Sequence, residues 1–132
     1  MDGAILHIHP RITATELMTG LMTILPPDSR EEKTIHAITT AEFTIRLFPN
    51  KKREEGEKSL AFPDGYFNFH SYLEFTPEDH ISDEVAAARL SEIMEYLWKR
   101  EIPCVVVSEW DDLLPHAGGY DNPALPWPET AS

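Results

Sequence analysis

Hydrophobic and polar residues alternate along three stretches of the chain, and this period of two is typical of β-strands with one buried face. The stretches are residues 4–10, 35–47 and 66–75. Residues 35–47 predict one long strand or two short ones ending at Pro49, with Ile35 and Ala37 among the inward positions. In the strongest pattern, residues 66–75, one face carries Phe67, Phe69, Leu73 and Phe75, and the other carries Tyr66, Asn68, His70, Tyr72 and Glu74.

A first amphipathic helix is predicted over residues 13–25, where hydrophobic residues recur every three to four positions. Thr13 stands three residues before Glu16, which is the spacing of a capping box. Gly20 weakens this helix slightly and permits close packing against a neighbouring element. Pro26 ends the pattern, so we expect a loop from there.

A second, longer helix is predicted over residues 82–100, capped by Ser82 or Asp83. Its buried stripe consists of Val85, Leu90, Ile93, Met94 and Leu97. A continuous apolar run at residues 103–107, which contains three β-branched valines, then predicts a short buried strand. The order strand, helix, one or two strands, strand, helix, strand predicts an α+β fold. We expect a ferredoxin-like split βαβ sandwich, in which an antiparallel sheet carries two helices on one face.

The chain divides into an α+β domain at residues 1–108 and an acidic segment rich in Pro and Gly at residues 109–132. The second part contains too many apolar residues to remain in solvent, so we expect part of it to pack on the domain. Leu113 and Leu114 are its predicted anchors. Residues 50–59 are charged and lack apolar side chains, which predicts a solvated loop.

The composition suits one cytoplasmic domain. The chain has 132 residues, of which 42% are hydrophobic, enough for a single core. No apolar run is long enough to span a bilayer, and no basic region precedes the first apolar residues as in a signal peptide. The single cysteine, Cys104, excludes an internal disulfide and fits a reducing compartment.

The net charge of −12 disfavours nucleic acids and anionic membrane surfaces as partners. From Ser59 onward the chain has 14 acidic residues but only three basic ones, Arg89, Lys99 and Arg100. A basic protein would be attracted to such a chain. Solubility alone would also account for the acidity.

The stretch "SEWDDLLPHAGGYD", residues 108–121, concentrates acidic and aromatic residues directly after the last predicted strand. Its acids could serve as general acid and base or hold a hard cation, but the spacing does not fit an EF-hand loop. An interface or an ordinary acidic loop is the preferred interpretation, and the Gly-Gly pair indicates a turn. The predicted partner-binding residues are Glu109, Trp110, Asp111, Asp112, Tyr72, Glu74 and Tyr120.

Three histidines offer an alternative. His7 and His9 share one face of the first strand, and with His70 or His36 they could ligate zinc, although they could equally be solvated polar residues. Cys104 lies in an apolar run without a CxxC motif, which favours a buried structural thiol. The chain contains no nucleotide-binding or hydrolase motif. We therefore expect no enzyme, metal or cofactor, with a small metal-binding protein or enzyme as the alternative.

The motifs "FNFHSYLEF" and "VVVSEWDDLLPHAGGY" resemble a group of small, mostly uncharacterised bacterial proteins that share a "D-[FW]-E-[DE]-x-L-P-x-x-GGY"-like segment. The resemblance covers roughly residues 66–120. Glu109 stands where Asp is usual and Asp111 where Glu is usual, which argues against specific catalysis by these acids. In size, acidity and α+β pattern the chain also resembles immunity proteins of bacterial toxin systems, including contact-dependent inhibition. That resemblance implies a protein that binds and blocks one cognate toxin, while a structural subunit of a larger assembly is a third hypothesis.

Overall fold

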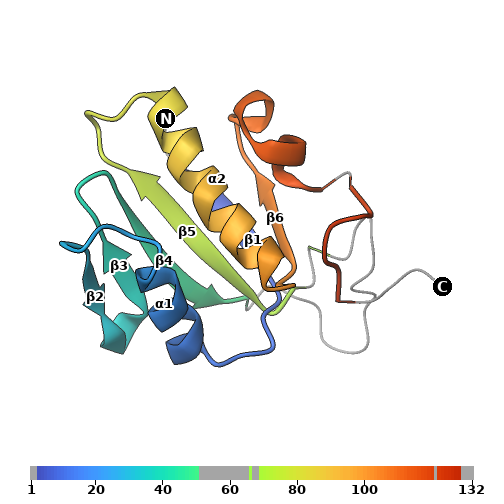
Figure 1. Ribbon diagram of the computed structural model, residues 1–132, viewed down its shortest axis with the longest axis horizontal. Coiled ribbons are helices and arrows are strands. Elements are labelled where there is room, and N and C mark those ends of the chain that lie inside the picture. Colours follow the sequence, from blue (N-terminus) through green and yellow to red (C-terminus); the bar gives the residue numbers. More distant parts are fainter. Residues whose placement is uncertain (1–2, 51–65, 67–68, 121, 129–132) are drawn as a thin grey trace.

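The computed structural model describes residues 3–50, 66, 69–120 and 122–128. Among these residues six strands form one antiparallel sheet in the order β2-β3-β4-β5-β1-β6 (Figure 1). The strands are β1 (Ala4–Ile8), β2 (Arg30–Glu32), β3 (Ala37–Thr39), β4 (Phe43–Pro49), β5 (Ser71–Pro77) and β6 (Cys104–Val107). Helices α1 (Ala14–Met22) and α2 (Asp83–Lys99) cover one face of the sheet (Figure 1). The predicted α+β class, with an antiparallel sheet and two helices, is thus confirmed for the described chain.

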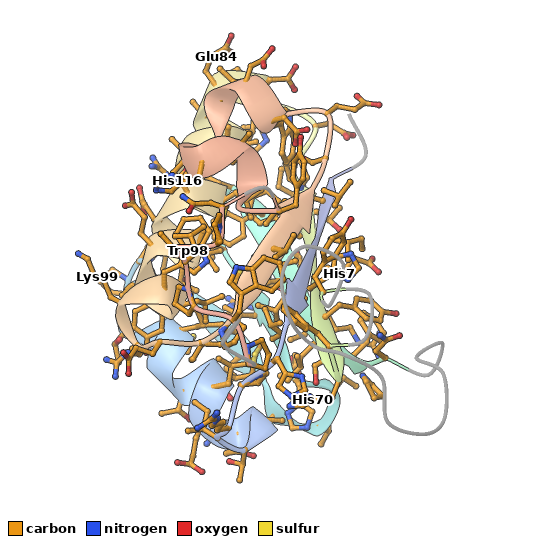
Figure 2. All side chains as sticks on the ribbon, turned by 90° about the vertical axis from the view of Figure 1, so that its right-hand side faces the viewer. His7, His70, Glu84, Trp98, Lys99 and His116 are labelled. Carbon is orange, nitrogen blue, oxygen red and sulfur yellow. The ribbon has the colours of Figure 1, made fainter. Side chains whose placement is uncertain are left out.

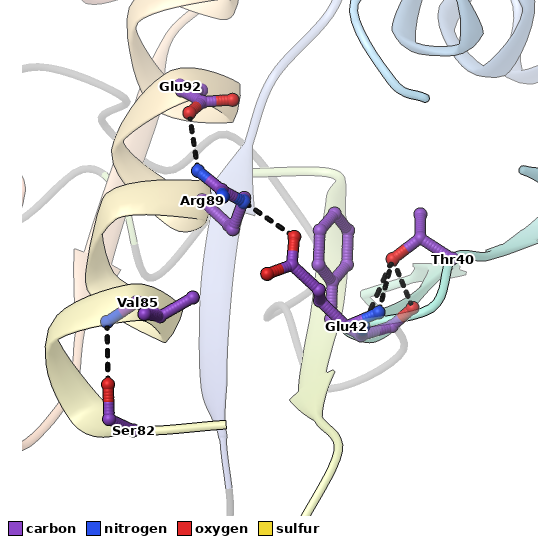
Figure 3. Close-up of polar contacts among 7 residues, drawn as sticks. Thr40, Glu42, Ser82, Val85, Arg89 and Glu92 are labelled. Atoms are coloured by element: carbon purple, nitrogen blue, oxygen red, sulfur yellow. Dashed lines mark hydrogen bonds and ion pairs between the residues drawn. The ribbon is translucent and has the colours of Figure 1, made fainter. Parts of the chain in front are cut away.

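Both helices begin at the side chains that the sequence indicates. The hydroxyl of Thr13 accepts a hydrogen bond from the Glu16 backbone N–H over 3.1 Å, and the Thr13 backbone N–H donates one to the Glu16 carboxylate, which completes the capping box. At α2 the cap is Ser82, whose hydroxyl accepts from the Val85 N–H over 3.2 Å (Figure 3). Each cap satisfies backbone donors that the first helical turn leaves unpaired.

The core lies between the sheet and the two helices. Leu17 and Leu21 of α1 are buried there, as are all the predicted stripe residues of α2 except the half-buried Val85. Two residues that follow β6, Trp110 and Leu114, belong to the same core. The beginning of the acidic segment is therefore packed on the α+β elements.

The strand predicted from Tyr66 begins five residues later, at Ser71. Side-chain hydrogen bonds hold the chain before that point: the Asn50 side chain donates to the Phe69 carbonyl, and the His70 ring contacts both Ser71 and the Pro10 carbonyl. Phe69 is buried as expected, but against His9 and Trp127. Residues 67–68, which the same prediction included, lie outside the described residues.

The structure also differs from the prediction over residues 30–47. The two-strand version is correct, as β3 and β4, but the edge strand β2 was not expected. Ile35 lies in a short 3₁₀ helix, η1 (Lys33–Ile35), and is exposed, whereas Ile38 takes the inward position on β3. His36 adopts a left-handed conformation at the end of η1 and interrupts the alternation there, whereas Ala37, Phe43 and Ile45 are buried as predicted. The predicted loop lies outside the described residues from residue 51 onward.

No helix within the described ranges is long and apolar enough to cross a membrane.

Candidate protein-binding surface

The direction of the strands brings three acidic segments to one end of the sheet. Ala4 at the start of β1 pairs with Phe75 near the end of β5, and Ile5 pairs with Val107 at the end of β6. Since α2 follows β5, it begins at this end too (Figure 1). Three acidic segments therefore lie at the same end of the sheet: the turn before α2, the first turn of α2 and the segment after β6.

We call this region the acidic end. It consists of Glu78, Asp79, Asp83, Glu84, Glu109, Asp111 and Asp112. All are exposed except Asp111, which is half-buried, and Figure 2 shows Glu84 among outward-pointing carboxylates. The salt bridges between described residues join Arg89 to Glu42 and to Glu92, and none neutralises a carboxylate of the acidic end. The end therefore presents a concentrated negative potential.

The four acids of the β5–α2 region were not among the predicted site residues. In the sequence, Asp83 and Glu84 are explained by the helix dipole alone, because carboxylates stabilise a helix N-terminus. The signal that links them to residues 109–112 is topological: in a strand–helix–strand crossover with parallel strands, both strands end, and the helix begins, at the same end of the sheet.

Trp110 was predicted to contact a partner, but only 2% of it is exposed. Its ring meets Phe75 edge-on with centroids 6.0 Å apart, and its backbone N–H donates to the Ser108 hydroxyl over 3.1 Å. A buried ring cannot offer contact area, so this residue anchors the acidic segment instead. Its indole nitrogen and one carboxylate oxygen of Asp111 are buried without a hydrogen-bond partner among the described residues.

The remainder of the segment is held by Leu114 and by the two glycines. Leu114 is buried as predicted, whereas Leu113 is 47% exposed. Two short 3₁₀ helices, η3 (Asp111–Leu113) and η4 (Pro115–Gly118), lead to Gly118 and Gly119, whose φ angles of +93° and +89° confirm the predicted turn.

Tyr120 was predicted to act together with these acids, but the chain has by then left the acidic end. Gly119, the residue before it, packs against Trp98 in the last turn of α2 and lies near the Cys104 carbonyl at the start of β6. The side chain of Tyr120 is 37% exposed. It is thus separated from Glu109 by the length of β6.

Tyr72 and Glu74 lie on the sheet face opposite the helices, which we call the second sheet face. Glu74 pairs with Ile5, which in turn pairs with Val107, so Glu74 is close to the acidic end. Tyr72 stacks on Phe48 of β4, with ring centroids 5.2 Å apart and planes 18° from parallel. A pocket of about 510 Å³ on this face is lined by both predicted residues together with Ile5 and Phe48.

The histidines of the alternative hypothesis come together only in part. The rings of His9 and His70 lie 4.4 Å apart, and Nδ1 of His9 accepts a hydrogen bond from the His70 backbone N–H. Both ring nitrogens of His70 are engaged, with the Ser71 hydroxyl and the Pro10 carbonyl. His7 contacts Tyr66 instead, and burial lowers the pKa of His7. Among the described residues no group of three metal-binding side chains is positioned to hold an ion, so the geometry lends no support to this alternative.

Cys104 is buried in β6 as the sequence indicates. Burial also raises the pKa of its thiol, since a thiolate would lose its hydration there. Such a thiol is a structural group and a poor nucleophile.

Positive charge gathers at the opposite end of the molecule. Arg11 follows β1, and Lys99 and Arg100 end α2. A cavity of about 720 Å³ there is lined by Arg11 and Arg100 together with the prolines of residues 123–128. The acidic end and the basic side chains of Arg11, Lys99 and Arg100 therefore lie at opposite ends of α2.

Comparison of the chain with protein-family models, with curated proteins and with solved structures found no match.

Proposed function

We propose that this protein is a cytoplasmic binding protein that neutralises a basic protein partner, in the manner of an immunity protein that occludes a bacterial toxin domain. The observation that carries the proposal is the acidic end. Seven carboxylates from the β5–α2 turn, the first turn of α2 and the segment after β6 meet there, and none forms a salt bridge with a described Lys or Arg.

The mechanism is electrostatic attraction followed by steric occlusion. Unpaired carboxylates on one end raise the association rate of a cationic surface and fix its orientation. Glu109 and Asp112 are held in place by a buried neighbour, because Trp110 between them is packed in the core. A surface that is ordered in this way loses less conformational freedom when a partner binds.

The order of the strands supports a more specific assignment of the fold. The four strands β6-β1-β5-β4 stand in the spatial order 4-1-3-2 of their sequence, and α1 and α2 follow the first and third of them. We infer a ferredoxin-like split βαβ unit to which the β2–β3 pair is added at one edge. We further propose that the chain belongs with the small bacterial proteins that the motifs of residues 66–120 resemble, and that it acts as an immunity protein.

The test is binding to the product of the neighbouring gene, measured by pull-down and by association kinetics at low and high salt. We expect a complex whose association slows steeply with salt, and co-expression that relieves the partner's toxicity. The variant Glu109→Gln, Asp111→Asn, Asp112→Asn should fold normally and associate more slowly.

The matched control removes the same charge away from the acidic end: Glu32→Gln, Glu95→Gln, Glu101→Gln, all at exposed positions. This control should associate like the native protein apart from a small general charge effect. If neither complex formation nor relief of toxicity is found, or if both triple variants slow association equally, the proposal is wrong. A stable homo-oligomer on a sizing column would instead favour the structural-subunit hypothesis.

A further inference from the structure

The pocket on the second sheet face has a chemistry of its own. Ile5 of β1 and the stacked rings of Phe48 and Tyr72 provide apolar surface, and Glu74 of β5 provides a carboxylate. Glu74 is exposed and forms no salt bridge with a described residue. Flat aromatic rings beside one unpaired carboxylate match a long side chain that has an apolar stem and a cationic tip.

One contact within the protein already shows this preference. The guanidinium of Arg46 lies over the ring of Phe48, 4.7 Å from the ring centroid. Arg46 also stands beside Glu74 in the register of β4 and β5, yet it is not part of the described pocket lining. The Phe48 ring thus binds a guanidinium in this environment, as cation–π attraction predicts.

The pocket is continuous with the acidic end. The pairs Glu74–Ile5 and Ile5–Val107 cross the sheet from the pocket to the last residue of β6. Val107 is 49% exposed, so an exposed apolar side chain lies between the pocket and Glu109. A partner that approaches the carboxylates of the acidic end would therefore also reach the pocket.

We infer that this pocket receives an arginine side chain of the basic partner, with the guanidinium stacked on Tyr72 and paired with Glu74, because the Phe48 ring already contacts both Arg46 and Tyr72. The inference rests on the proposed function, because it names the residue type by which the partner is anchored. Arginine suits the site better than lysine, since its planar guanidinium both stacks on rings and binds a carboxylate with two hydrogens. Buried anchors of this kind account for much of the affinity in protein interfaces.

The pocket can be tested without the partner. We would titrate ¹⁵N-labelled protein with Nα-acetyl-arginine methylamide and follow the amide shifts of Ile5, Phe48, Tyr72 and Glu74. Nα-acetyl-norleucine methylamide, which has a similar stem but no charge, is the control ligand. We expect saturable shifts at these four amides with the arginine probe and weaker shifts with norleucine.

Variants then separate the contributions. Glu74→Gln should raise the dissociation constant of the arginine probe about two- to fivefold, as expected for a partly exposed ion pair. Tyr72→Leu should weaken binding as well, whereas Tyr72→Phe keeps the ring and should bind like the native protein. Glu95→Gln removes an exposed charge outside both the pocket and the acidic end and should leave binding unchanged. Equal shifts with both probes, or no shift at the four amides, would overturn the inference.

The partner assay distinguishes this inference from the proposed function. If the acidic-end variant slows association but Tyr72→Leu and Glu74→Gln dissociate like the native protein, the pocket is not an anchor and the function still holds. If the neighbouring product does not bind at all, the proposed function fails whatever the arginine probe shows.

Discussion

Arg89 of α2 donates a hydrogen bond from Nε to Oε1 of Glu42 over 2.7 Å, and this contact joins the long helix to the turn between β3 and β4 (Figure 3). The turn itself is fixed by Thr40, whose hydroxyl accepts from the backbone N–H groups of Glu42 and Phe43. Arg89 also donates to Glu92 over 3.0 Å. One arginine therefore serves two carboxylates, and helix and turn are held in one arrangement.

We expect Glu42→Gln to lower the free energy of unfolding by less than about 1 kcal/mol, because an ion pair open to water is weakened by solvent screening. The side chains of Arg89 and Glu42 are 37% and 30% exposed. Urea unfolding at low and high salt measures the effect, and Glu92→Gln serves as the control, since its pair with Arg89 lies within α2 and spans 3.0 Å. A loss above about 2 kcal/mol would show that the pair behaves as a buried one.

Gly20 of α1 faces Tyr96 of α2 so closely that a Cβ atom at residue 20 would collide with the tyrosine hydroxyl. In an exposed helix Gly→Ala would stabilise by about 1 kcal/mol. Here we expect Gly20→Ala to destabilise the protein by about 1–3 kcal/mol, the usual cost of overpacking.

The double variant Gly20→Ala, Tyr96→Phe gives the sharper result. Without the hydroxyl, the new Cβ would meet the ring at an ordinary contact distance, so Gly20→Ala should become stabilising in the Tyr96→Phe background. Thermal unfolding of the four proteins in this cycle measures the sign of each step. If Gly20→Ala had the same effect in both backgrounds, the hydroxyl would not be the limiting contact.

The parts of the fold that could be predicted from the sequence rest on short-range patterns. The spacing from Thr13 to Glu16 and the stripe of α2 lie within one or a few helical turns, so neighbouring residues are sufficient to indicate them. Strand β2 is the opposite case. Its residues, Arg30–Glu32, have no hydrophobic alternation, and the strand exists because β3 supplies its hydrogen-bond partners.

The candidate site could likewise be predicted only in part from the sequence. The acidity of residues 109–112 is visible in the sequence, but their association with Asp83 and Glu84 depends on the direction of β6 relative to α2. The alternation pattern correctly placed Tyr72 and Glu74 on the face away from the helices. It could not show that Trp110 turns inward, because aromatic residues in acidic loops occur both as core residues and as contacts.

The buried thiol of Cys104 leads to a direct chemical test. Burial raises the pKa of this thiol, so the reactive thiolate is suppressed in the folded protein. We expect Ellman's reagent to react with the folded protein only as fast as the chain unfolds, and immediately in strong denaturant. Since Cys104 is the single cysteine, each reacting molecule releases one chromophore. Fast reaction under native conditions would show that β6 is more accessible than its burial implies.

Burial lowers the pKa of His7 below its ordinary value of 6.5. Between the lowered pKa and 6.5, the unfolded chain binds more protons than the folded protein, so the free energy of unfolding decreases as the pH falls through this window. Below the folded-state pKa both states are protonated and the decrease ends. We expect His7→Asn to show a flatter pH dependence in urea titrations, while His80→Asn at an exposed position keeps the native slope. Identical slopes for both variants would exclude His7 as the source.

Gly118 holds the acidic segment against the sheet edge, and its replacement tests whether that contact supports the fold. A Cβ atom there would collide with the Val106 carbonyl oxygen, and the φ angle of +93° disfavours any side chain. We expect Gly118→Ala to destabilise the protein by about 1–3 kcal/mol or more, because both the strain and the collision must be relieved by moving the segment. Trp110 reports such movement, since its ring is packed on Phe75 and would enter a new environment. Near-ultraviolet circular dichroism and urea unfolding should therefore change together, and a variant with native stability and native aromatic signal would show that the segment is not tied to β6.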